Sequence, residues 1–166
     1  MLAQHFHQLS ETEACSKNIL GPAYFEISEL AIIVDGSTGA NLAPDSPRCV
    51  HGEDKFSISL KLEFNKSPLT SFLIELDTEI HLRFVLEDIS DTSVEKELAT
   101  MLTTLKDTYV YRLQWTGTAA TARLSPGLYA VAAIAQIGPV NHGSSQPVVG
   151  YGYLAGKLLQ VAETSG

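Results

Sequence analysis

The stretch 56–64 alternates without a break between apolar and polar side chains, and this pattern constrains the fold most strongly. Its apolar positions are Phe56, Ile58, Leu60, Leu62 and Phe64, with serine, lysine and glutamate between them. A helix would scatter these five residues around its circumference, whereas a strand places them all on one face. One buried and one wet face are typical of antiparallel sheets. We therefore expect an all-β, antiparallel fold.

Six further segments carry strand signals and are separated by turn residues. They are 23–34, 70–76, 80–86, 109–115, 130–137 and 148–161. Within the first segment the apolar phase changes, which predicts a bulge near Ser28. The fifth segment is apolar on both phases, which predicts a central strand buried on two sides. The arms 70–76 and 80–86 are expected to form a hairpin about Asp77-Thr78.

Between 88 and 107 the apolar spacing changes to one that fits a helix. The residues at this spacing are Val94, Leu98, Met101, Leu102 and Leu105. Asp91 or Thr92 would cap the start of such a helix. A loop with a single turn is the alternative. The prediction is an antiparallel β-sandwich of about seven strands, with one short helix inserted near 92–105.

The segment Leu124-x-Pro126-Gly127-x-Tyr129 resembles the tyrosine corner of immunoglobulin-like and related sandwiches, including fibronectin-type and transthyretin-like domains. The resemblance implies that the Tyr129 hydroxyl returns to nearby backbone at the corner. It covers about six residues and supports an architecture at superfamily level only. No cysteine follows Tyr129 in its strand, and Trp115 comes too late for the core tryptophan of a true immunoglobulin domain. The resemblance brings no active site with it.

The chain of 166 residues has the length of one domain and a formal net charge of -8 at pH 7. We expect an N-terminal leader over 1–21 and a sandwich domain over 22–166. The negative charge argues against nucleic acid and against an anionic membrane surface, because both attract clustered cations. A basic protein partner would be attracted instead.

The N-terminal residues show no cationic and apolar signal pattern, and no apolar run is long enough for a membrane span. We therefore expect a cytoplasmic protein in which Cys15 and Cys49 are reduced. A Cys15–Cys49 disulfide stays open as the alternative if a signal has been removed.

No motif predicts a catalytic residue, a metal ligand or a cofactor. His5-x-His7 is the closest histidine pair, but it lies in the leader. The densest chemical cluster joins Cys49 and His51 to Glu53 and Asp54, and a thiol, an imidazole and a carboxylate are the parts of a cysteine nucleophile system. We expect an extended segment to keep the Cys49 and His51 side chains apart.

Two long loops, 36–54 and 138–147, are the expected binding regions, because loops of this length are often functional. Their candidate binding residues are Asn41, Asp45, Arg48 and His51 in the first loop and Asn141, His142, Ser144 and Gln146 in the second. Counting strands alternately up and down places the two loops at opposite ends of the sandwich.

These observations favour a non-catalytic protein-binding or assembly module, whose partner is another copy or a different protein. The alternative is a small-ligand or carbohydrate binder that uses either long loop. A third hypothesis is a thiol-dependent enzyme at Cys49 and His51.

Overall fold

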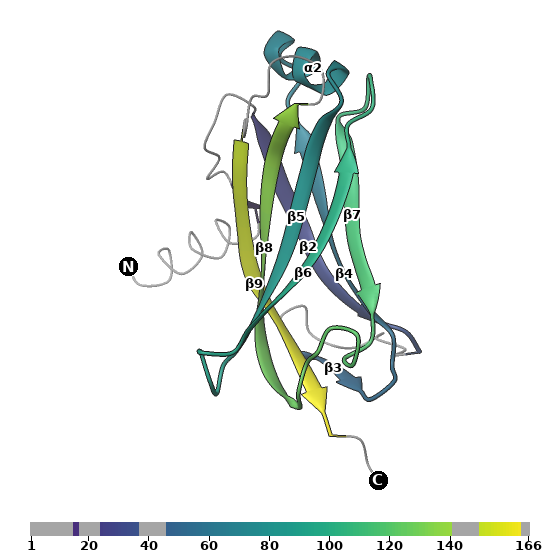
Figure 1. The fold of residues 1–166 in the computed structure, drawn as a ribbon, viewed down its shortest axis with the longest axis vertical. Helices are drawn as coiled ribbons and strands as arrows, with labels where there is room; N and C mark the ends of the chain where they lie inside the picture. The colour runs from purple at the N-terminus through teal and green to yellow at the C-terminus, as the bar shows by residue number, and fades with distance from the viewer. Residues whose placement is uncertain (1–14, 17–23, 37–45, 141–149, 164–166) are drawn as a thin grey trace, which may run out of the picture.

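The computed structural model describes residues 15–16, 24–36, 46–140 and 150–163, which form two curled sheets packed face to face (Figure 1). One sheet has four strands in the order β1 (Cys15–Ser16), β2 (Phe25–Val34), β4 (Phe56–Phe64) and β7 (Val110–Gly117). The other has five strands in the order β3 (Arg48–His51), β9 (Gly150–Ala162), β8 (Gly127–Val140), β5 (Thr78–Asp88) and β6 (Glu95–Thr103). One short helix, α2 (Pro68–Glu75), joins β4 to β5. The predicted mainly-β class with one short helix is confirmed.

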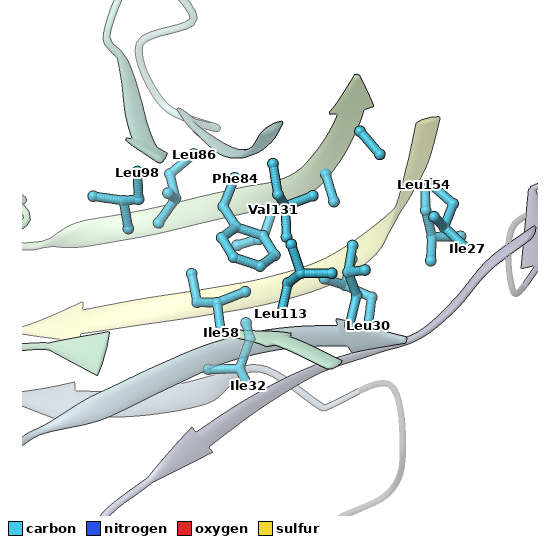
Figure 2. Packing of buried hydrophobic residues seen from close by; sticks show 14 of the residues in the cluster. Ile27, Leu30, Ile32, Ile58, Phe84, Leu86, Leu98, Leu113, Val131 and Leu154 are labelled. Atoms are coloured by element: carbon cyan, nitrogen blue, oxygen red, sulfur yellow. The ribbon is translucent and has the colours of Figure 1, made fainter. Parts of the chain in front are cut away.

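The core lies between the two sheets and is built by the inward phase of each strand. Figure 2 shows Phe84, Leu86 and Val131 of the five-stranded sheet facing Ile58 and Leu113 of the other. β4 spans the predicted range 56–64, and its five alternating apolar side chains are all buried. The alternation in the sequence therefore does mark the core face.

The predicted bulge near Ser28 is confirmed. The register between β2 and β4 shifts between Ser28 and Ala31, and Glu29 adopts a left-handed backbone with φ 55°. The extra residue switches the inward phase, so that Ile27 and Leu30 both reach the core. The Glu29 carboxylate receives the Arg112 guanidinium of β7 at 2.8 Å.

The helix expected near 92–105 is wrong, because residues 95–103 form strand β6. This strand pairs with β5 from Glu79↔Thr103 to Glu87↔Glu95. Leu98 faces the core while Met101 points to solvent. The apolar residues of this segment fit both the helical and the strand period, and the β-branched threonines at 100 and 103 favour the strand.

The strand expected over 70–76 is also wrong, because this segment forms α2. Ser67 caps the helix by accepting a hydrogen bond from the Thr70 backbone N–H at 3.2 Å, and Pro68 opens its first turn. A serine cap followed by proline is a helix-start signal. The hairpin about Asp77-Thr78 is therefore replaced by a helix that enters β5 directly.

Two buried threonines attach the C-terminal end of α2 to the sheet. The Thr78 hydroxyl donates to the Leu73 carbonyl at 2.5 Å, and the Thr104 hydroxyl donates to the Ile74 carbonyl at 2.9 Å. The Thr104 hydroxyl also accepts the Thr78 backbone N–H at 3.0 Å. These bonds satisfy the Ile74 carbonyl in the last helical turn and give a second donor to the Leu73 carbonyl, which also accepts the Leu76 backbone N–H at 3.2 Å.

The corner hydrogen bond implied by the Pro126-Gly127-x-Tyr129 segment is present. The Tyr129 hydroxyl donates to the Ser125 carbonyl at 2.8 Å, and the ring is 1% exposed. Burial raises the pKa of Tyr129, and the neighbouring Asp88 charge raises it further. This bond ties the loop before β8 to the strand itself.

Asp88 ends β5 and gives stability that depends on pH. Its Oδ1 accepts hydrogen bonds from the Ser90 hydroxyl at 2.6 Å and from the Ser90 backbone N–H at 2.8 Å, and these bonds lower its pKa. Because the folded pKa lies below the unfolded value of about 3.9, the stabilisation is complete above that pH. It is lost as the pH falls through the folded pKa.

We expect Asp88→Asn to flatten the dependence of stability on pH below about pH 4. Urea unfolding at pH steps between neutral and acid measures this. Ser90→Ala should give an intermediate slope, since the backbone donor remains. Equal acid sensitivity of Asp88→Asn and the parent would contradict the assignment.

Candidate functional site

The outer, solvent-facing side of the five-stranded sheet carries an apolar groove, which we call the outer groove. Its volume is about 410 Å³. Its floor is formed by Val85, Ala130, Ala132, Ile134 and Ala155, with Tyr153 and Leu158 at the side of β9. Register aligns Ala132 of β8 between Val85 of β5 and Ala155 of β9. Small side chains in the middle strand leave the hollow between larger neighbours.

The groove follows from the unusual sequence of β8. Its inward phase, including Val131 and Ala133, is fully buried, while the outward phase, including Ala132 and Ile134, is only half-buried. β8 is the central strand, as predicted, but the expected burial on both sides is wrong for the outward side. The described part of the chain leaves this apolar phase partly open to solvent.

Acidic residues form the rim of the groove on β5 and β6. Glu87 and Glu95 stand directly opposite each other in the β5–β6 ladder. Like charges placed opposite in this way destabilise a sheet. Glu97, the third acidic residue, has the Arg83 guanidinium at 3.4 Å, whereas no ion pair within the described residues reaches Glu87 or Glu95. Lys157 of β9 also lines the groove, so the acidic rim on β5 and β6 is the side where a further cation from outside would be stabilised.

A second hollow of about 440 Å³ continues along the same face. It is lined by His81, Arg83, Ala99, Met101 and Gln136, among others. The His81 imidazole contacts the Glu79 carboxylate at 2.6 Å. Met101 is 56% exposed at one side of this hollow.

The aromatic residues of β9 point outward on this face. Tyr151 and Tyr153 are 43% and 52% exposed. Tyr111 of β7, by contrast, is buried in the core. Trp115 packs against Phe56 with ring centroids 5.3 Å apart.

Of the residues predicted for the long loops, the structure describes Arg48 and His51. Arg48 lines a small hollow of about 80 Å³ together with Leu30 and Ser46, and His51 ends β3. The others lie outside the described residues: Asn41, Asp45, Asn141, His142, Ser144 and Gln146. The predicted placement of the two loops at opposite ends depends on His142 and stays a prediction.

The expected separation of Cys49 and His51 is wrong. Side chains two residues apart on a strand share a face. Cys49 Sγ lies 3.9 Å from His51 Nε2 on the exposed face of β3, and Cys49 carries a free thiol. Across the described ranges, no group of three or more histidine, cysteine or acidic side chains is arranged to hold a metal ion. The described residues also contain no helix that is long and apolar enough to cross a membrane.

The comparisons leave the family open. No family model matches the sequence, and no curated protein matches it. Among solved structures, a β-glucosidase from Listeria innocua in complex with gluconolactone is similar with a TM-score of 0.43 and 11% identity. The match covers 86% of this chain and 16% of that chain. A likeness at this level carries no argument about function.

The sequence does contain a signal for the outer groove, in residues 130–137. The prediction of binding residues in the long loops does not use it. Apolar residues on both phases of 130–137 favour burial on two sides. An apolar phase that the described part of the chain leaves uncovered is equally consistent with an interaction surface. The opposed glutamates could not be found this way, because their pairing depends on the register of β6.

Proposed function

We propose that this chain is a non-catalytic protein-binding module whose outer groove takes a segment of another protein. That segment would carry a lysine or arginine beside small or medium-sized apolar side chains. The observation that carries the proposal is the apolar floor around Ala132 joined to the opposed Glu87 and Glu95, which make no ion pair with any residue that the structure describes.

Each part of the groove supplies a different contribution to binding. Covering the floor removes apolar area from water, a favourable contribution of about 25 cal/mol per Å² that the lost freedom of the two partners partly offsets. A partner cation between Glu87 and Glu95 would relieve the repulsion that the free protein carries. A second copy of the chain fits less well, because its net charge of -8 repels the acidic rim.

The test uses a fluorescently labelled peptide of alternating lysine and valine, with an alternating glutamate and valine peptide as its control. We expect the basic peptide to bind and Glu87→Gln/Glu95→Gln to weaken this binding about tenfold, or about 1.4 kcal/mol. The same double variant should make the free protein slightly more stable, because the opposed charges are gone. Fluorescence anisotropy and urea unfolding measure the two effects.

A matched control lies on the other sheet. Glu26 of β2 and Glu63 of β4 are also directly opposite each other, so Glu26→Gln/Glu63→Gln makes the same change in charge away from the groove. This control should keep the parent affinity. The proposal fails if the groove variant binds the basic peptide as tightly as the parent, or if the control loses as much affinity.

A small-ligand or carbohydrate binder is the second candidate, and one observation favours it. Tyr151 and Tyr153 present exposed aromatic rings on the same face of β9, and flat rings suit stacking against a sugar. Binding of a soluble oligosaccharide that Tyr153→Ala abolishes would favour this candidate. The lysine–valine peptide would then fail to compete.

We also propose that the fold is related to immunoglobulin-like or transthyretin-like sandwiches and that the protein is cytoplasmic. The Tyr129–Ser125 hydrogen bond and the two facing sheets support an immunoglobulin-like or transthyretin-like origin. The free thiol of Cys49 supports a reducing, cytoplasmic setting.

A further inference from the structure

Cys49, His51 and Asp54 form a connected cluster at the end of β3. Cys49 Sγ lies 3.9 Å from His51 Nε2, and the other ring nitrogen, His51 Nδ1, lies 3.6 Å from Asp54 Oδ2. The imidazole therefore stands between a thiol and a carboxylate. This is the order in which a base and its orienting group activate a nucleophile.

The local sequence explains why the three side chains meet. Cys49 and His51 share the exposed face of β3 because they are two residues apart on a strand. Gly52 then takes a positive φ of 40°, and the chain turns so that the Asp54 backbone N–H donates to the His51 carbonyl at 2.8 Å. In return the His51 backbone N–H donates to Asp54 Oδ2 at 3.1 Å. The turn thus fixes the carboxylate beside the ring.

We propose that Cys49 is a site of reversible thiol modification by low-molecular-weight disulfides such as oxidised glutathione. In the forward step the Cys49 thiol gives its proton to His51 Nε2, and the thiolate attacks one sulfur of the disulfide. A new Cys49–sulfur bond forms as the disulfide bond breaks. The released thiolate then takes the proton from the imidazolium, so one small thiol leaves for each thiol modified.

The setting suits modification rather than turnover of a bound substrate. The His51 and Asp54 side chains are 64% and 45% exposed, so a dissolved disulfide reaches the sulfur directly. The hollow at neighbouring Arg48 has a volume of about 80 Å³, which is smaller than ordinary ligand sites. Cys49, unlike a packed core cysteine, is exposed.

The test measures the rate of reaction of Cys49 with 5,5′-dithiobis(2-nitrobenzoate), in a Cys15→Ser background that leaves one thiol. We expect His51→Ala to slow the reaction at pH 7 about tenfold and Asp54→Asn to slow it less. Glu53→Gln is the matched control, since it removes the neighbouring exposed acid in the same turn. This control should keep the parent rate.

A second measurement needs no substitution in the cluster. Mass spectrometry after incubation with oxidised glutathione should show one added glutathione that a reductant removes. The proposal is overturned if His51→Ala reacts as fast as the parent, if Glu53→Gln slows equally, or if oxidised glutathione leaves no adduct that a reductant removes.

Discussion

Thr104→Val is expected to lower the free energy of unfolding by about 2–4 kcal/mol, because it leaves two buried backbone groups without a partner. Thr104 is 1% exposed. Its hydroxyl accepts the Thr78 backbone N–H and donates to the Ile74 carbonyl. Valine has nearly the same shape, so the packing stays while both hydrogen bonds are lost. Urea unfolding monitored by circular dichroism measures the change.

The neighbouring Thr103→Val is the matched control for this prediction. Thr103 is exposed at the end of β6, whereas the hydroxyls that donate to α2 carbonyls belong to Thr78 and Thr104. Its substitution should change stability by less than about 0.5 kcal/mol. Equal losses in the two variants would show that the hydrogen bonds of Thr104 to Thr78 and Ile74 do not account for the effect.

Gly152→Ala is expected to lower the free energy of unfolding by about 1–3 kcal/mol through overpacking. A Cβ at this position would lie 2.7 Å from Phe25 Cε2 and 3.0 Å from Phe25 Cζ. Phe25 is fully buried and packs against Phe64 with ring centroids 5.9 Å apart, so its ring has little room to move. Ordinary strand preference would favour alanine, which makes a loss of stability diagnostic of the contact.

A double-mutant cycle with Phe25→Leu separates the contact from other effects. Leucine removes the ring edge that meets the new methyl group. Gly152→Ala should therefore cost less in the Phe25→Leu background than in the parent. Additive losses would contradict the contact as the cause. Chemical denaturation of the four proteins gives the coupling free energy.

Elements whose pattern is decided locally could be predicted from the sequence. β4 alternates over nine residues, and the change of apolar phase at Ser28 correctly predicts the bulge in β2. The predictions of a strand over 70–76 and a helix near 92–105 were both wrong, and each error has a physical cause. Taken alone, the apolar residues of 95–103 fit both the helical and the strand period. Pairing with β5 along the whole segment decides that it forms a strand. In 68–75, the Ser67-Pro68 cap is a stronger signal than the apolar content that favours a strand.

The candidate site was less accessible to sequence reasoning. The long loops favoured as binding regions hold mostly residues outside the described ranges. The outer groove depends on which side of β8 the second sheet covers, and the opposed Glu87 and Glu95 depend on a strand that was expected to be a helix. Both are long-range properties of the fold. The Cys49–His51 contact, by contrast, follows from strand geometry alone.

The parallel pairing of β3 with β9 has a consequence for self-association. β3 covers the backbone of residues 159–162, so those hydrogen-bonding groups are occupied within the chain (Figure 1). Without β3 they would be an uncovered strand edge, which is a template for adding a strand from a neighbouring molecule. β3 is itself the edge strand of the sheet, and its four residues make that edge short, which disfavours edge-to-edge pairing there. The exposed Cys49 thiol lies on this same strand, so a group added to Cys49 would lie on the strand that pairs with β9.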